Sequence, residues 1–116
     1  MSPVFDEKEL LDRIDNDWEF LAETVQMLST DGRALMAEVR RASGAGDAAA
    51  LGRAAHTLKG MISNFCSPTT QASAFAVEKI GKDGDLSSAP QAVTVLETDL
   101  DALIAALNDF VSTRSA

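Results

Sequence analysis

The stretch "WEFLAETVQMLSTDGRALMAEV", Trp18 to Val39, decides the fold class of this 116-residue chain. Apolar residues recur in it at spacings of three, four and seven, as they do along one face of an α-helix. A half-buried strand would alternate apolar and polar residues, and the sequence holds no credible stretch of that kind. The pattern predicts one long helix over residues 17–42, whose apolar seam is formed by Trp18, Leu21, Val25, Leu28, Leu35 and Val39.

The same periodicity continues on both sides of this stretch. A short helix is expected before it, ended by "DND" at residues 15–17, and Gly- and Pro-containing turns separate the segments after it. Long helices joined by short turns pack as antiparallel neighbours. The sequence therefore predicts an all-α, up-down-up-down four-helix bundle with a short N-terminal helix as a lid, in a single domain over residues 1–116. The further helices are expected over residues 6–14, 48–65, 69–82 and 90–111, and in residues 69–82 the expected buried positions are Ala72, Phe75 or Ala76, and Ile80.

The composition excludes several functional classes. The net charge is −8, and a nucleic-acid backbone is bound by Lys and Arg, so a nucleic-acid partner is not expected. The single cysteine, Cys66, excludes an internal disulfide, and one histidine with one cysteine cannot supply the clustered ligands of a zinc site. No apolar run approaches the ~20 residues of a membrane span, and no signal peptide is recognisable. We expect a free-standing, monomeric, cytoplasmic protein that binds neither membrane nor metal.

The stretch "RAAHTLKGMISN", Arg53 to Asn64, contains the only histidine, His56. On a helix that turns ~100° per residue, the apolar side chains of this region lie on the side away from His56. His56 is therefore expected on an exposed face rather than in the core, although an ordinary solvated histidine remains an alternative. The buried side is predicted to hold Leu51, Ala54, Ala55, Leu58, Met61, Ile62 and Phe65, and the face around His56 to hold Ala49, Gly52, Arg53, Lys59, Gly60 and Ser63.

This face has the chemistry of an acceptor for a phosphoryl group. A glycine within a helix lowers stability by about 1 kcal/mol relative to alanine, yet Gly52 and Gly60 lie one turn before and after His56, where they leave room for another body. Neutral imidazole is a nucleophile, and Arg53 and Lys59 flank it with fixed positive charge, which suits an incoming group with several anionic oxygens. No Ser, Cys or acid stands at a spacing that would pair with the imidazole in a catalytic triad.

The residues Ala55-His56-Thr57-Leu58-Lys59-Gly60 resemble the A-H-x-L-K-G signature of the histidine-containing phosphotransfer (Hpt) domain of bacterial two-component phosphorelays. The segments "GDAAALGRAAHTLKG" and "DWEFLAETVQMLSTD" extend the resemblance over nearly the whole chain. It implies that His56 accepts a phosphoryl group from a receiver-domain aspartate and passes it to another, that Lys59 neutralises phosphoryl oxygens, and that Gly60 gives the partner clearance. It also implies response-regulator receivers and a hybrid histidine kinase as partners, with Mg²⁺ carried by the receiver and no cofactor on this chain.

Two features of the chain bear on how far the resemblance extends. The family usually has a glycine ten residues after the histidine, where this chain has Cys66, so the geometry of that turn is open. Met61 is bulkier than the small residue usual at its position, and we interpret it as packing at the edge of the core. Phe20 and Met27 either pack in the core or form an apolar docking patch. The residues predicted to contact a partner are Gly52, Arg53, Ser63, Met27 and Phe20.

Other functions fit the sequence less well. In the dimerising hairpin of a histidine kinase, an acid follows the phosphorylated histidine, whereas Thr57 follows His56 here, and no nucleotide-binding segment is present for ATP-dependent activity. A hydrolase or metalloprotein would need a second histidine or a clustered nucleophile. A non-catalytic module that binds or sequesters receivers, with the same bundle fold, remains the alternative to a phosphorelay intermediate.

Overall fold

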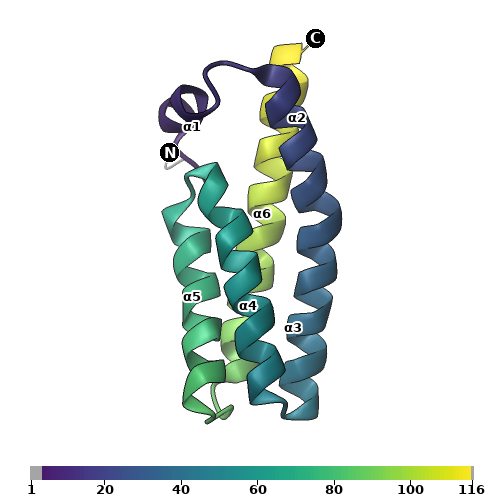
Figure 1. The fold of residues 1–116 in the computed structure, drawn as a ribbon, viewed down its shortest axis with the longest axis vertical. Coiled ribbons are helices and arrows are strands. Elements are labelled where there is room, and N and C mark those ends of the chain that lie inside the picture. Colours follow the sequence, from purple (N-terminus) through teal and green to yellow (C-terminus); the bar gives the residue numbers. More distant parts are fainter. Residues whose placement is uncertain (1–3, 116) are drawn as a thin grey trace.

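The structure, a computed structural model that describes residues 4–115, is a bundle of long helices with no strand among the described residues. Residues 1–3 and 116 of the predicted domain lie outside this range. A continuous long helix made of α2, η1 and α3 packs with α4, α5 and α6 in the predicted up-down-up-down order, and α1 lies at the end where α4 ends and α5 begins (Figure 1). The bounds are α1 Glu7–Arg13, α2 Trp18–Met27, η1 Leu28–Gly32, α3 Arg33–Ala45, α4 Ala48–Ile62, η2 Ser63–Phe65, α5 Pro68–Asp83 and α6 Ala89–Ser115.

Capping residues set the helix borders close to the predicted ones. The side chains of Asp6, Asp17 and Asp47 accept hydrogen bonds from backbone N–H groups at the starts of α1, α2 and α4. Each satisfies a donor that the first helical turn leaves unpaired. Gly46 ends α3 with φ 71°, in the left-handed conformation that glycine adopts without a steric penalty. The turn between α3 and α4 is thus fixed by two adjacent residues, and it determines where the histidine-bearing helix begins.

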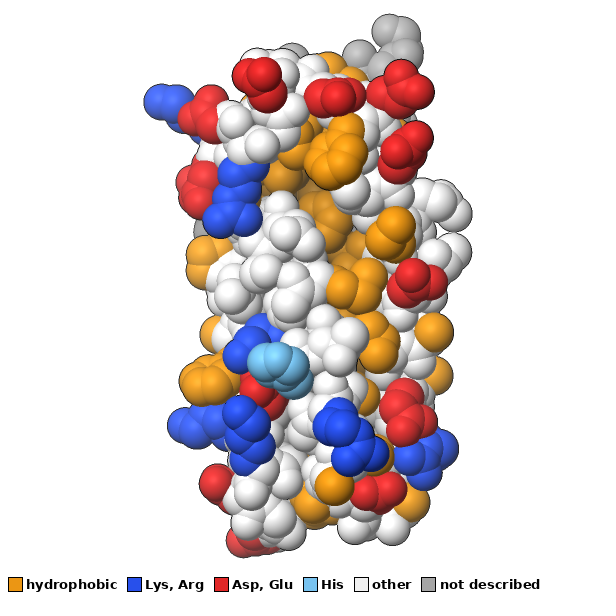
Figure 2. All heavy atoms as spheres, viewed as in Figure 1, with side chains coloured by type: hydrophobic (Ala, Val, Ile, Leu, Met, Phe, Trp, Pro, Cys, Tyr) orange, Lys and Arg blue, Asp and Glu red, His pale blue; other side chains and the backbone are white. Residues whose placement is uncertain are grey.

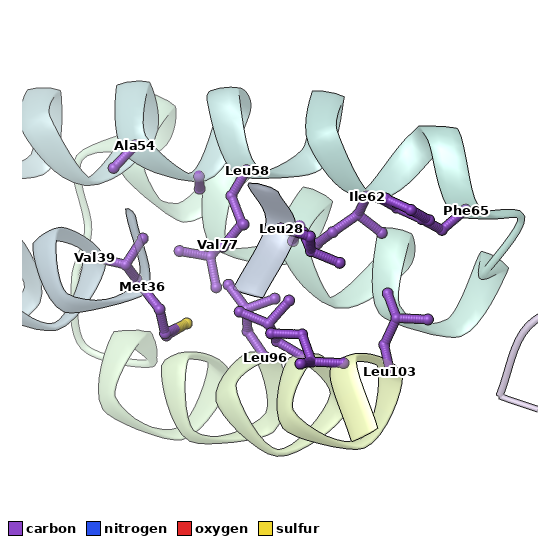
Figure 3. Close-up of a cluster of buried hydrophobic side chains, with 14 of the residues drawn as sticks. Leu28, Met36, Val39, Ala54, Leu58, Ile62, Phe65, Val77, Leu96 and Leu103 are labelled. Carbon is purple, nitrogen blue, oxygen red and sulfur yellow. The ribbon is translucent and has the colours of Figure 1, made fainter. Parts of the chain in front are cut away.

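The core lies between the four long helices (Figure 3). The predicted seam of the first long helix is largely confirmed, because Leu21, Val25, Leu28 and Val39 are buried. Within the described residues, no helix is both long enough and apolar enough to cross a bilayer. The largest fully buried apolar side chains are Leu10, Leu21, Leu28, Leu51, Leu58, Ile62, Leu96, Leu100, Leu103, Leu107 and Val25.

The prediction for the buried face of α5 was wrong. Ala72, Phe75 and Ala76 are exposed and Ile80 is only half-buried. The helix is rotated so that a different row faces the bundle, namely Thr70, Ala74, Val77, Glu78 and Gly81. An apolar count disfavours this row because it contains a charged residue and a glycine, whereas the alternative row contains a phenylalanine and an isoleucine. Both unexpected residues, Glu78 and Gly81, contact α4, at His56 and Gly52 respectively.

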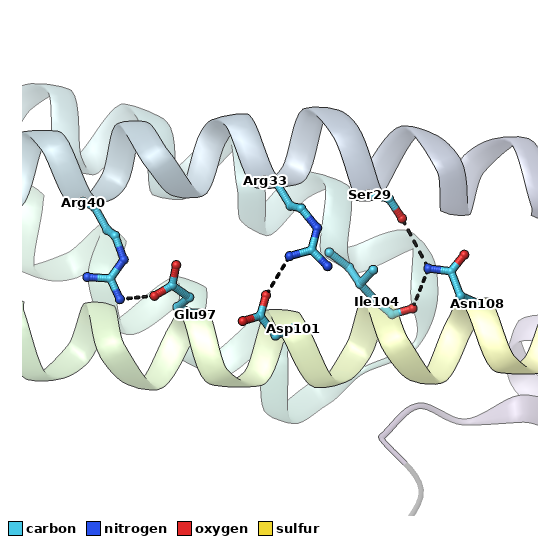
Figure 4. Close-up of polar contacts among 7 residues, drawn as sticks. All are labelled: Ser29, Arg33, Arg40, Glu97, Asp101, Ile104 and Asn108. Atoms are coloured by element: carbon cyan, nitrogen blue, oxygen red, sulfur yellow. Dashed lines mark hydrogen bonds and ion pairs between the residues drawn. The ribbon is translucent and has the colours of Figure 1, made fainter.

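Polar contacts join the first long helix to α6 along the bundle surface (Figure 4). The Nη1 atom of Arg33 lies 3.0 Å from Oδ1 of Asp101. About two turns further along α3, Arg40 forms an ion pair with Glu97. Near the π-helical turn η1, the Asn108 amide of α6 lies 3.5 Å from the hydroxyl oxygen of Ser29, and it also donates to the carbonyl of Ile104 in its own helix at 3.0 Å. Exposed ion pairs of this kind contribute about 0–1 kcal/mol each, so they add little to the stability of the bundle.

Candidate functional site

His56 lies on the surface of α4, as the helical periodicity predicted. Its side chain is 66% exposed, whereas Leu58 and Ile62 on the opposite side of the helix are fully buried. Met61 is half-buried against the core, which confirms its interpretation as a packing residue. Figure 2 shows the pale-blue histidine at the surface in the lower half of the view, with cationic side chains near it. The imidazole is therefore open to a partner on one side and supported by the core on the other.

The imidazole has an acidic partner that sequence analysis missed. Glu78 of α5 places Oε2 2.8 Å from His56 Nδ1, although its side chain is only 1% exposed. No acid was expected near His56 because none stands close to it in the α4 sequence. The available signal was the position of Glu78 on α5, since it shares a helical face with Ala74 and Gly81 and is followed four residues later by Lys82.

Two lysines hold the buried carboxylate in its ionised form. Lys59 Nζ lies 2.7 Å from Oε1 of Glu78, and Lys82 Nζ lies 3.0 Å from Oε2. Oε1 has no well-aligned hydrogen bond among the described residues, so the Lys59 ammonium acts on it as a charge partner. Lys59, then Lys82 and the N–H of His56, outweigh the opposing effect of burial and lower the pKa of Glu78 to about 2. The group is a carboxylate at neutral pH.

This ionisation assigns the tautomer of the imidazole. A carboxylate only accepts hydrogen bonds, so the short contact requires His56 Nδ1 to carry the proton and donate it to Glu78 Oε2. In the neutral ring the other nitrogen, Nε2, then carries the lone pair. Because the side chain is largely exposed, this lone pair is available to a partner. The arrangement supplies an oriented nitrogen nucleophile whose far side is held by a fixed negative charge.

Lys59 is less free than the sequence indicated. Its side chain is only 25% exposed, and besides contacting Glu78 its ammonium lies 4.9 Å from the centroid of the Phe75 ring. A cation over an aromatic face is attracted by the ring quadrupole. Lys59 is thus restrained beside His56, three residues further along α4, and is not fully solvated.

The prediction that Gly52 contacts a partner is not supported, because Gly52 is buried. It meets Gly81 of α5 backbone to backbone, and a Cβ added at Gly81 would lie 2.4 Å from the Gly52 nitrogen. The missing side chains let α4 and α5 approach closely, which allows Glu78 to reach His56. The helical periodicity of this segment correctly places Gly52 on the face of His56, but it does not show that a neighbouring helix covers that part of the face.

Of the other residues predicted to face a partner, Arg53 and Gly60 lie on the exposed face of α4, and Ser63 lies where that helix ends. Gly60 is exposed, and a Cβ added there would meet nothing within 4 Å, so its surface is open. Arg53 is exposed and lines a hollow of about 480 Å³ that also contains His56 and Lys82. Ser63 is half-buried at the end of α4, and its hydroxyl donates to the Gly60 carbonyl at 2.6 Å. The structure brings Arg53 and Gly60 to the accessible face.

Phe20 and Met27 do not belong to the core. Their exposed fractions are 51% and 55%, which is high for apolar side chains of this size. Phe20 also borders a groove of about 330 Å³ with Leu10, Ile14 and Phe65. Figure 2 shows apolar side chains lining a furrow in the upper half of the same face that carries the histidine. An apolar surface and the nucleophile therefore share one side of the molecule.

The turn between α4 and α5 forms with Cys66 in place of the family's glycine. Cys66 adopts φ 56° and ψ 47°, the left-handed conformation that a glycine would take at this position. Its carbonyl accepts a hydrogen bond of 2.9 Å from the N–H of Asp6, which ties the entry of α1 to the turn. Burial raises the pKa of the Cys66 thiol. The turn survives with a strained but well-packed residue.

Comparisons with known proteins identify the family and the fold of the chain. The described residues hold no cluster of three or more His, Cys, Asp or Glu side chains that would bind a metal ion. The model of the Hpt domain family matches residues 23–106. Among solved structures, histidine-containing phosphotransfer protein B from Pseudomonas aeruginosa PAO1 superimposes with a TM-score of 0.88 at 20% sequence identity, over 97% of this chain and 98% of that one. No curated protein sequence matches significantly.

Proposed function

The chain belongs to the Hpt domain family of phosphotransfer intermediates, and on that premise we propose that His56 accepts a phosphoryl group from a receiver-domain aspartate and passes it to another. The observation that carries this proposal is the exposed imidazole whose Nδ1 proton is held by Glu78. It leaves the Nε2 lone pair as the nucleophile, on the side of the ring that a partner can reach.

The proposed step conserves atoms and charge. The Nε2 lone pair attacks the phosphorus of the aspartyl phosphate, an N–P bond forms, and the P–O bond breaks with its electron pair going to the aspartate carboxylate. The Nδ1 proton stays on the ring, which becomes cationic, and Glu78 Oε2 at 2.8 Å stabilises that charge. Onward transfer reverses the step at a second aspartate. Glu78 is thus a positioning residue, which fixes the tautomer and orientation of His56.

Lys59 and Gly60 have complementary roles in this proposal. The Lys59 ammonium, restrained by Glu78 and Phe75, lies on the same helix face as the nucleophile and neutralises phosphoryl oxygens. Gly60 leaves the surface open for the receiver's active-site loops. The receiver supplies the Mg²⁺ and most of the transition-state stabilisation, while this chain supplies an oriented nucleophile.

We propose that the receiver docks on the apolar surface that contains Phe20 and Met27. These side chains are exposed, and they lie on the first long helix beside the histidine-bearing one. Arg53 and Ser63 would contact the partner at the two ends of the site. In binding measurements with a receiver, Phe20→Ser and Met27→Gln should each weaken association, and Val95→Gln, at an exposed apolar position on α6, is the matched control.

Transfer of label from a phosphorylated receiver domain tests the function. We expect the purified chain to acquire acid-labile, base-stable label, and His56→Gln to remain unlabelled. If His56→Gln is labelled as fast as the wild type, the site assignment is wrong. If the wild type binds phosphorylated receivers without becoming labelled, the non-catalytic binding module is the correct function instead.

Variants of Gly60 and Glu78 test the geometry. Gly60→Gln should weaken receiver binding, and Gly44→Gln should not, since Gly44 is another exposed helical glycine with open space around it, at the end of α3. Glu78→Gln should slow transfer and shift the tautomer populations of His56, which ¹⁵N NMR of the imidazole reports directly. A slower transfer with unchanged tautomer populations would contradict the positioning role.

A further inference from the structure

A second lysine shares the buried carboxylate with the histidine. Oε2 of Glu78 receives both His56 Nδ1 at 2.8 Å and Lys82 Nζ at 3.0 Å, whereas Lys59 faces the other oxygen. These contacts place the Lys82 ammonium within about 6 Å of the imidazole, the range over which a charge acts strongly on its neighbour. One carboxylate faces two ammonium groups, so the unphosphorylated site has a surplus positive charge.

The two lysines differ in how firmly they are held. Lys59 is largely buried and restrained by the Phe75 ring, but the Lys82 side chain is 68% exposed and stands at the rim of the hollow beside His56. Lys82 approaches the buried carboxylate from the solvent side, and when it moves away Glu78 still pairs with Lys59 and with the Nδ1–H of His56, so its charge stays compensated. Lys82 is therefore able to change partners while Lys59 stays in place.

Phosphorylation of His56 changes both ends of this contact. The imidazolium formed on transfer binds Glu78 Oε2 more strongly through its Nδ1–H, and thereby competes with Lys82 for that oxygen. At the same time, about two negative charges arrive on the phosphoryl oxygens. We propose that Lys82 is a second phosphoryl-binding cation, which moves from Glu78 to the phosphoryl group when His56 is phosphorylated. This inference rests on the proposed function of His56.

The close contact of α4 with α5 explains why a residue of α5 is positioned for this role. The backbone nitrogen of Lys82 would lie 3.6 Å from a Cβ at Gly52, so the backbone of Lys82 lies directly against the histidine-bearing helix. Lys79, three residues earlier on α5, places its ammonium 5.6 Å from the centroid of the Phe75 ring, and it neither lines the hollow beside His56 nor pairs with Glu78. Two lysines of one helix thus carry the same charge but differ in access to the site.

The test compares Lys82→Gln with Lys79→Gln, which removes the same charge from the same helix. A receiver domain that labels the wild-type chain serves as the phosphoryl donor. We expect Lys82→Gln to slow labelling of His56 about tenfold, equivalent to one lost contact in the transition state, and Lys82→Arg to restore most of the rate. Lys79→Gln should stay within about twofold of the wild type, the change expected of an exposed charge.

NMR of the lysine side chains gives a readout that a structural role would not move. On phosphorylation of the wild type, the Nζ resonance of Lys82 should shift more than that of Lys79. Equal slowing by the two Gln variants would show that Lys82 acts only through general electrostatic attraction, and an unchanged rate in Lys82→Gln or an unmoved Lys82 resonance would also overturn the proposal. In each of these outcomes the wild type still acquires label on His56, so only the role of Lys82 is overturned. If the proposed function is wrong, the wild type remains unlabelled or the His56→Gln variant becomes labelled.

Discussion

Replacing Gly81 with alanine tests whether the close approach of α4 and α5 builds the site. The added Cβ would lie 2.4 Å from the nitrogen of Gly52, 2.6 Å from its Cα and 2.9 Å from the carbonyl oxygen of Ala48. All three are backbone atoms, so no side-chain rotation relieves the contact, and the helices must separate. Overpacking of this kind costs about 3 kcal/mol, and the better helix propensity of alanine offsets about 1 kcal/mol of it.

We therefore expect Gly81→Ala to lower the free energy of unfolding by about 2 kcal/mol, and the melting temperature by roughly 8 °C for a domain of this size. Thermal and urea unfolding followed by circular dichroism measure both quantities. Because the separation moves α5 away from α4, the contact between His56 and Glu78 should weaken as well. The phosphotransfer rate at a temperature where the variant is fully folded reports this second effect.

Two controls separate the clash from the general effect of alanine. Gly52→Ala adds its Cβ at the same crossing from the opposite helix, but the nearest atoms would lie at 3.6 Å, an ordinary contact distance. Gly60→Ala adds its Cβ in open space, so it should raise stability by about 1 kcal/mol through helix propensity alone. A Gly81→Ala protein as stable as the Gly52→Ala protein would refute the argument that the backbone contact at Gly81 sets the helix spacing.

Three further predictions concern the carboxylate, the turn and the lid. Interactions in the folded protein lower the pKa of Glu78 from 4.5 to about 2. The ionised carboxylate therefore contributes on the order of 2 kcal/mol to the free energy of unfolding, after allowance for the solvent exposure of Lys82. This contribution is present above pH ~4.5 and is lost as the pH falls towards about 2. Urea unfolding should accordingly show the difference between wild type and Glu78→Gln shrinking over that range. Cys66→Gly should change stability by less than about 1 kcal/mol, because relief of the left-handed strain offsets the lost packing, whereas Cys66→Val should lose more in the same assay. Arg13→Ala removes the hydrogen bond of 2.8 Å to the Ser63 carbonyl, and hydrogen exchange in α1 should become faster.

The face of α4 was predictable because a single helix decides it. The apolar residues of that helix are regularly spaced, so the exposure of His56 and Gly60 follows from the sequence of one segment. The conformation of the turn at Cys66 does not follow from the sequence alone, because a residue other than glycine adopts the left-handed conformation only when its surroundings favour it. Here the buried side chain and the hydrogen bond from Asp6 supply that support.

The partner of His56 was not predictable in the same way, because it depends on the rotation of α5. Charged side chains are almost never fully buried unless paired, so hydropathy places Glu78 on the outside and Phe75 on the inside. The true rotation requires two glycines, Gly52 and Gly81, to meet across the helices, and their contact has no apolar signature. The charged residues indicate the true rotation, because Glu78 pairs with Lys59 of α4 and with Lys82 of α5.

The net charge of the cluster around His56 is complementary to that of a phosphoryl group. The lowered pKa of Glu78 stabilises the fold relative to the protonated carboxyl group, but relative to an apolar side chain of similar size a buried, paired carboxylate contributes little, because desolvation offsets most of the attraction. Its presence is better explained by its effect on His56, which it holds in one tautomer. With Lys59 and Lys82 the unphosphorylated site carries a surplus of one positive charge, in a protein whose net charge is −8. A phosphoryl group with about two negative charges on a cationic ring would bring this sum close to zero, so the proposed phosphorylation of His56 would leave the cluster electrically balanced.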